Sequence, residues 1–302
     1  MLASEAVETV RSYLTGSEID EISVLLSAYT AGSGTLNLQY PKRNIAPGAT
    51  LTAGLNTFTV VETSTDGATV NVIPSMDGGP DVSVPAGTIV RVKPNFTTWA
   101  IYREIQSEID SMSAASTGLY QSWVVEATSL AFESGIYAIP DRTDGLLPFR
   151  LLRSEFLVAG SDSLWVTFTD TEFIKQGNGV RVFSDPPQVA GYRFSLAVPF
   201  GQMVDLTTDL TSLGLTNSLA GIAMYGATAM MALGWEGRRV QPVFQGDSRR
   251  ATEVTPTSNS ALAMRFKQAQ QQAITEEQTR LIGQWGYRQP QIGGSTAGIS
   301  RW

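Results

Sequence analysis

The stretch NSLAGIAMYGATAMMALGW, residues 217–235, decides the fold of the second half of the chain. It contains no charged residue, and small side chains recur along it, among them Ala223, Gly226 and Ala227. Small side chains let helix backbones approach closely, so we expect a helix in the centre of a bundle or between subunits. An uncharged run of this length also raises the question of a membrane span. The hydroxyl residues and glycines within 210–235 favour a helix buried inside a protein assembly, and we expect no membrane contact.

Another helix is expected after this one, from about Thr255 to Gln284. Thr255 is a suitable cap, and Pro256 suits the first helical turn. The remaining segment, 287–302, is rich in glycine and cannot hold regular structure alone. It nevertheless carries large apolar residues, so we interpret it as an extended arm that becomes ordered on a partner. The candidate contact residues of this arm are Tyr287, Arg288, Ile292, Ile299 and Trp302.

The N-terminal part, 1–34, is predicted to form a pair of helices. The first carries an apolar stripe and is broken by Gly16. The second would be capped by Ser17 and would carry its own apolar stripe. The members of that second stripe are Ile19, Ile22, Leu26 and Tyr29.

The middle of the chain alternates between β and helical character. Segment 35–94 is predicted to be a small antiparallel β-domain inserted between helices, because short β-rich runs alternate there with Gly and Pro turns. A helix is expected within 95–118, followed by a β-rich region over 119–200 and by the C-terminal helices over 201–286. The fold class is therefore α+β, a helical bundle that carries two β-regions. The clearest strands are expected at 35–40, 57–61, 69–73, 88–92, 146–152, 163–168, 179–183 and 191–198.

Composition excludes several classes of chemistry. Of the 302 residues, 42% are hydrophobic and only 16% are charged, which indicates a globular chain whose surface is partly covered by partners. The chain contains neither cysteine nor histidine. Disulfides, thiolate or imidazole metal ligands and a histidine-based triad are therefore excluded. Because histidine is the commonest proton carrier in catalysis, we expect a protein that is not an enzyme and that holds no cofactor.

Two charged features have structural interpretations. The turn Asp77-Gly78-Gly79-Pro80-Asp81 clusters carboxylates, but its spacing does not match an EF-hand, so a β-turn without metal is expected. Two pairs of basic residues follow the uncharged helix, and they are interpreted as contacts between subunits or as local salt bridges. A net charge of −7 argues against a plain nucleic-acid binder. The paired basic residues are Arg238, Arg239, Arg249 and Arg250.

The order of these parts resembles the head-to-tail adaptor (neck) proteins of long-tailed bacteriophages, of the type found in actinobacteriophages. The opening segment 7–29, the run PAGTIVRVKPNF at 85–96 and the helix 98–113 followed by Gly118-Leu119-Tyr120 carry the resemblance. The most specific stretch is DSRRATEVTP at 247–256, before the last helix. The sequence departs from the pattern at 241–245, where an acidic-aromatic segment is usual, and in its longer arm.

The resemblance implies a structural virion protein that forms a homo-oligomeric ring of about twelve copies. Such a connector would be assembled in the host cytoplasm and would lie in the virion neck. It would join the portal protein above to a stopper or tail-terminator protein below, with the arm reaching the portal. Its lumen would be a DNA ejection channel through which the genome passes without specific contact, because an acidic ring repels phosphate.

Two other functions stay open at this point. A tail-tip or receptor-binding virion module would bind glycan through exposed aromatic residues of the β-regions. A carboxylate-based glycoside hydrolase would need two carboxyl groups roughly 5–10 Å apart in a cleft.

Overall fold

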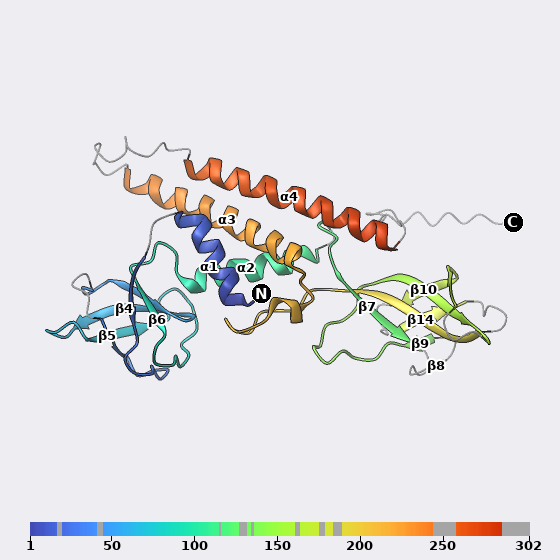
Figure 1. The fold of residues 1–302 in the computed structure, drawn as a ribbon, viewed down its shortest axis with the longest axis horizontal. Coiled ribbons are helices and arrows are strands. Elements are labelled where there is room, and N and C mark those ends of the chain that lie inside the picture. Colours follow the sequence, from blue (N-terminus) through green and yellow to red (C-terminus); the bar gives the residue numbers. More distant parts are fainter. Residues whose placement is uncertain are drawn as a thin grey trace. The chain divides into compact units, whose positions relative to one another are not determined.

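The computed structural model describes residues 1–16, 20–40, 45–114, 116–126, 132–133, 136–160, 164–174, 179–183, 189–243 and 258–285. In these residues the chain is a mixed α+β protein with four α-helices, a six-stranded antiparallel half-barrel sheet and two smaller antiparallel sheets (Figure 1). It divides into two compact units. Unit 1 comprises Met1–Gln121, Asp141–Leu147 and Val198–Ile274, and unit 2 comprises Ser122–Pro140, Pro148–Ala197 and the chain from Thr275.

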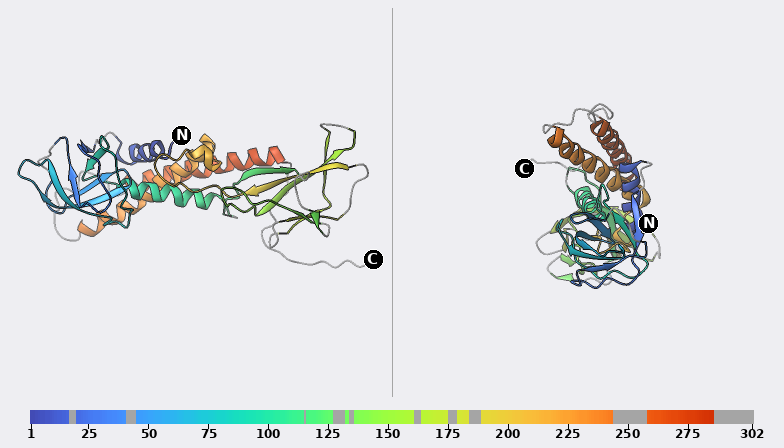
Figure 2. Two further views of the ribbon diagram at one scale, coloured as in Figure 1. Left: turned by 90° about the horizontal axis from the view of Figure 1, so that it is seen from below. Right: turned by 90° about the vertical axis from the view of Figure 1, so that its left-hand side faces the viewer.

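Unit 1 contains a helical layer. Helices α1 and α2 pack against each other and against α3. The part of α4 up to Ile274 lies along α3, on the side away from the half-barrel (Figures 1 and 2). The bounds are α1 Ala3–Thr15, α2 Thr98–Met112, α3 Asn217–Val243 and α4 Ser258–Trp285, with a short 3-10 helix η3 at Leu210–Leu213.

The half-barrel follows α1 in the chain. Its strand order is β1-β6-β3-β4-β5-β2, and a bridge between Leu25 and Leu38 brings the two edge strands together at one end. Its interior is filled by buried side chains such as Leu51, Phe58 and Val90. The bounds are β1 Glu21–Val24, β2 Thr35–Asn37, β3 Thr50–Ala53, β4 Asn56–Thr63, β5 Thr69–Pro74 and β6 Ile89–Val92.

Unit 2 is built from two four-stranded sheets, β11-β10-β14-β7 and β12-β13-β9-β8. Its core is rich in aromatic side chains, with Tyr192 and Phe194 stacked on β14 and Tyr137 packed beside them. The bounds are β7 Gln121–Glu126, β8 Phe132–Glu133, β9 Ile136–Ala138, β10 Arg150–Val158, β11 Trp165–Phe168, β12 Thr171–Ile174, β13 Gly179–Val182 and β14 Val189–Val198.

The prediction of a second helix in the N-terminal segment 1–34 is wrong. Residues 21–24 form strand β1, which pairs with β6, nearly seventy positions later in the chain. The proposed helical stripe is not buried as one face, since Leu26 is 63% exposed whereas Tyr29 is 2% exposed. Burial instead follows the two-residue period of a strand, with Ser23 inward and Ile22 outward. The sheet therefore begins before the predicted start of the β-domain at residue 35, and the proposed cap Ser17 lies outside the described residues.

Most other elements were predicted with shifted ends. The predicted strand 146–152 begins only at Arg150, after an irregular segment that contains Pro148. Strand β3 was not predicted, and α3 runs on to Val243. The uncharged run from 210 to 235 is divided between η3 and α3, because Gly214 takes a left-handed conformation with φ 85°. Among the helices in the described ranges, none combines the length and the apolar character needed to cross a bilayer.

Candidate functional site

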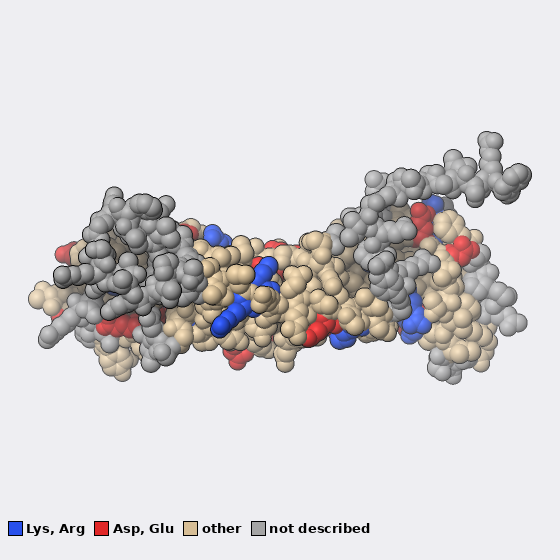
Figure 3. All heavy atoms as spheres, turned by 90° about the horizontal axis from the view of Figure 1, so that it is seen from above, with Lys and Arg blue, Asp and Glu red and all other residues tan. Residues whose placement is uncertain are grey.

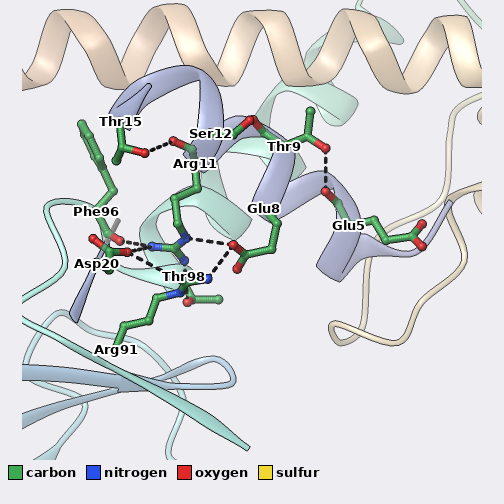
Figure 4. A network of polar contacts seen from close by, with 10 residues as sticks. All are labelled: Glu5, Glu8, Thr9, Arg11, Ser12, Thr15, Asp20, Arg91, Phe96 and Thr98. Carbon is green, nitrogen blue, oxygen red and sulfur yellow. Dashed lines mark hydrogen bonds and ion pairs between the residues drawn. The ribbon is translucent and has the colours of Figure 1, made fainter. Parts of the chain in front are cut away.

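A buried arginine joins α1 to the half-barrel in unit 1. Arg11 is 4% exposed, and its guanidinium donates to the carbonyl oxygen of Phe96 at 2.7 Å and to Oγ1 of Thr98 at 2.9 Å. Both acceptors lie at the start of α2, so this side chain joins two helices. Carboxylates of Glu8 and Asp20 lie 3.5 and 3.6 Å from it (Figure 4).

A second arginine completes this group from the sheet. Arg91 on β6 contacts Glu8 at 2.7 Å and Asp20 at 3.2 Å, so each carboxylate lies between two guanidinium groups (Figure 4). We call Glu8, Arg11, Asp20 and Arg91 the junction network. Its formal charges cancel, which is the condition under which charges are tolerated in a protein interior.

Burial dominates the electrostatics of this network. Desolvation lowers the pKa of Arg11, with a further lowering by Arg91, whereas Glu8 and Asp20 act in the opposite direction. Nε of Arg11 is buried and makes no hydrogen bond, because Glu8 at 3.5 Å lies outside good hydrogen-bond geometry. The network therefore fixes α1 on the sheet by hydrogen bonds and compensated charge, and it is a structural joint.

A groove opens beside the junction network. Its volume is about 350 Å³. Thr52, one of its lining residues, is 1% exposed, and its hydroxyl has no hydrogen-bond partner in the described residues. The lining includes one carboxylate, Glu8, which is already paired with Arg91, so this groove lacks the carboxyl pair that a glycosidase requires. The lining residues are Glu8, Thr52, Gly54, Thr88, Ile89, Arg91, Thr98 and Leu206.

A polar seam crosses the helical layer. The amide of Gln270 on α4 donates to the carboxylate of Glu108 on α2 at 2.6 Å, and the ammonium of Lys267 donates to Gln270 at 2.8 Å. Gly226 on α3 lies at this crossing, and a Cβ there would overlap both Glu108 and Gln270. The glycine therefore lets α2 and α4 meet across α3. Burial and the neighbouring Glu108 raise the pKa of Glu104, one helical turn away on α2.

The carboxylates of the 77–81 turn serve the local fold. Asp77 accepts from Oγ1 of Thr97, the N-cap of α2, and from the backbone N–H of Gly79. Asp81 accepts from the hydroxyl of Tyr29 at 2.8 Å and from the N–H of Gly32. Burial, with a further contribution from Asp81, raises the pKa of Tyr29 to about 12. The described residues contain no group of three potential metal ligands.

Aromatic side chains of unit 2 mostly support its core. Phe168, Tyr192 and Phe194 pack on one another inside the unit. Trp165 lies on the opposite face of its sheet, where the guanidinium of Arg193 covers its ring at 4.4 Å. A ring covered by a cation offers less surface to a sugar, so this tryptophan gives little support to a glycan platform.

The structure places only some of the predicted site residues. Ala223 and Ala227 are 1% and 0% exposed, and together with buried Gly226 they lie within the helical layer of a single chain. Within one copy their side chains are therefore covered by the chain's own elements. Arg238 and Arg239 lie on α3, but their side chains are outside the described residues. Seven other predicted site residues lie entirely outside the described residues: Arg249, Arg250, Tyr287, Arg288, Ile292, Ile299 and Trp302.

The junction network and the polar seam were not predicted from the sequence. Their partners are far apart in the chain, with 85 positions between Arg11 and Phe96 and 162 between Glu108 and Gln270. The one local signal was a charged residue, Arg11, on the otherwise apolar face of α1. No protein-family model matches the chain, and no curated protein matches its sequence.

Proposed function

We propose that this chain is a head-to-tail adaptor: a structural virion protein that forms a ring between the portal and the tail of a bacteriophage. The observation that carries the proposal is the order of parts along the chain. With one exception, a strand in place of the second N-terminal helix, the parts follow one another in the order expected from the sequence: helix α1, the half-barrel, helix α2, the second β-region and the pair α3–α4. The functional conclusion rests on this order together with the sequence stretches at 85–96, 98–120 and 247–256.

The physical character of the chain supports an assembly role. The charged side chains of the junction network in unit 1 pair with one another and connect α1 to the half-barrel. The outer surface of α3 and α4 is poor in charge (Figure 3). Surfaces of this kind are typical of contacts between subunits, whereas an active site concentrates perturbed titratable groups in a cleft. A net charge of −7 suits a channel wall that DNA passes without binding.

Partners follow from the same proposal. Copies of the chain form the ring, the extended arm 287–302 contacts the portal, and a stopper or tail-terminator protein binds below. In the arm, Trp302 is the candidate anchor, because aromatic residues dominate the binding energy of small contact surfaces.

Deletion of 287–302 tests the arm. The truncated chain is expected to keep the far-UV circular dichroism of the full chain and to lose its binding to purified portal protein in a pull-down. A matched variant retains the length of the arm but replaces Tyr287, Ile292, Ile299 and Trp302 by serine, and it should lose binding equally. Full-strength binding by both variants would refute the role of the arm.

Localisation in the particle tests the function itself. A single cysteine introduced at an exposed site gives a unique label, because the chain has none of its own. Gold-labelled chain in intact particles should appear at the collar between capsid and tail in electron micrographs. Label at the tail tip would support the receptor-binding alternative, and label absent from the collar would refute the adaptor function.

A further inference from the structure

The groove of unit 1 is surrounded by exposed apolar side chains. Ile89, which lines it, is 51% exposed, and Ile22 on the neighbouring strand β1 is 44% exposed. Antiparallel register places Ile22 opposite Arg91 and Val24 opposite Ile89, so these side chains share the outer face of the sheet. Removal of such an apolar surface from water lowers the free energy, so this surface is a candidate for contact with another protein.

A loop beside the groove displays the most exposed of these residues in a fixed conformation. Val204 is 84% exposed, and it lies two positions before Leu206, which lines the groove. The carboxylate of Asp205 accepts from Thr207 and Thr208, while Oγ1 of Thr208 accepts from two backbone N–H groups. Because these bonds already order the loop, a partner that covers Val204 would bear little cost for ordering it.

The surroundings of the groove carry an excess of negative charge. Six carboxylates lie on the segments that form it, against three cationic side chains and the terminal ammonium. The excess in these segments is therefore about two negative charges, and all of it lies outside the junction network, which is neutral. The carboxylates are Glu5, Glu8, Asp20, Glu21, Asp205 and Asp209, and the side-chain cations are Arg11, Arg91 and Lys93.

A surface with the opposite charge lies on the other side of the helical layer. On α4, Met264 is 63% exposed, and the exposed cations Arg265 and Lys267 flank it. Arg265 has no ion-pair partner in the described part of the chain. On α3, Met230 and Leu233 are 47% and 50% exposed. In Figure 3 most atoms of this view are uncharged, Lys and Arg atoms lie near its middle, and Asp and Glu atoms are visible as well.

We propose that the outer face of α3 and α4 in one copy docks onto the groove of the next copy. The apolar residues of the two surfaces would cover each other, and Arg265 would face the segments around the groove that carry the excess of negative charge. The two surfaces lie on different sides of unit 1, so the contact is heterologous, as a ring requires. This inference rests on the proposed ring and specifies which faces form it.

Cross-linking of the full-length chain tests the contact directly, because the chain has no native cysteine. Met264→Cys is combined in turn with Ile22→Cys, Ile89→Cys and Val204→Cys, and each double variant is treated with a short bismaleimide. A heterologous contact should give a ladder of dimers, trimers and higher species on a denaturing gel. In the control, Met76→Cys replaces Met264→Cys in each double variant. Met76 is 62% exposed, which matches the exposure of Met264.

The outcomes separate this inference from the proposed function. Ladders with Met264→Cys and their absence with Met76→Cys support the contact. Absence of ladders in all three combinations, in solution and on immobilised portal, would overturn it, and so would equal ladders in the control. If the chain binds portal but gives no ladder, the interface fails and the adaptor function stands. If ladders form but the chain is missing from the particle collar, the function fails and the interface stands.

A charge reversal gives a second, independent test. Arg265→Glu is expected to raise the concentration for half-maximal assembly about tenfold, measured by sedimentation at low salt. Arg181→Glu in unit 2 changes the net charge equally and removes only an exposed ion pair with Glu172, so it serves as the control. Equal effects of the two substitutions would contradict the proposed face.

Discussion

Substitution of Gly226 by alanine gives the sharpest test of the helical layer. The new Cβ would overlap the carboxylate of Glu108 and the amide of Gln270, which meet across α3 at this position. Relief requires the two side chains to separate, or α4 to move away from α3. Either response breaks the 2.6 Å hydrogen bond between them.

The expected cost follows from three contributions. Extra volume in a packed site costs about 1–3 kcal/mol, and the lower end applies here because the overlapped atoms are the ends of flexible side chains. Loss of a hydrogen bond to a charged group costs about 1.5–3 kcal/mol. The higher helix propensity of alanine returns about 1 kcal/mol. The sum of these contributions predicts that Gly226→Ala lowers the free energy of unfolding of unit 1 by about 2 kcal/mol.

Gly221 on the same helix provides a matched control. A Cβ at Gly221 would meet nothing within 4 Å. Gly221→Ala should therefore stabilise the protein by up to about 1 kcal/mol through helix propensity alone. Both variants are compared with the wild type by urea unfolding, followed by far-UV circular dichroism. If Gly226→Ala is as stable as Gly221→Ala, the close approach of α2, α3 and α4 at this position is wrong.

Three further predictions concern buried polar groups in unit 1. Arg11→Met leaves the largely covered carboxylate of Asp20 with one cation and should destabilise the protein by about 3 kcal/mol in urea unfolding; an unchanged midpoint would contradict the structural role of the network. Thr52→Val keeps the shape but removes the unpartnered hydroxyl, so the isolated chain should gain about 1 kcal/mol, and a loss would show that the hydroxyl is satisfied. Burial is the main cause of the raised pKa of Glu104, so the charged carboxylate is disfavoured in the folded state. The charged carboxylate therefore destabilises the fold, and this effect declines as pH falls through the folded pKa. Glu104→Gln should therefore be more stable than the wild type at pH 7, with a difference that shrinks towards pH 4; a constant difference across that range would refute the assignment.

Acidification should also reveal the opposite sign elsewhere in unit 1. Hydrogen bonds from Thr207 and Thr208 lower the pKa of Asp205, and those from Thr211 lower the pKa of Asp209. Groups of this kind stabilise the fold above their unfolded pKa, and that contribution is lost as pH falls through the folded pKa. The comparison of Glu104→Gln with the wild type cancels these shared contributions.

Local sequence signals predicted the helices well where the relevant interactions are local. The helix predicted within 95–118 is α2, and Thr97 caps it by accepting from the N–H of Ala100. Ile101, Ile105 and Ile109 follow at helical spacing, and all three are fully buried. Spacing and capping are properties of neighbouring residues, so they can be recognised without knowledge of the fold.

The same reasoning failed where a distant segment decided the structure. Residues 17–29 carry helical spacing and an acidic first turn, yet residues 21–24 pair with β6 and complete the sheet. Four backbone pairs and the burial of Ser23 at 1% outweigh a weak helical preference in a short segment. The candidate site shows the same limit, since the partners of Arg11 and Gln270 are known only once the chain has folded.

By itself, the sequence determined the α+β class, the absence of thiol and imidazole chemistry, and the small side chains that make α3 a central helix. Only the tertiary structure decided that β1 is a strand, that Gly226 makes room for a polar seam, and that exposed apolar residues collect beside the groove of unit 1. The physical reason is the range of the interactions. Helical propensity, capping and composition act over a few residues, whereas strand pairing, compensated burial of charge and the shape of a surface depend on segments that only the folded chain brings together.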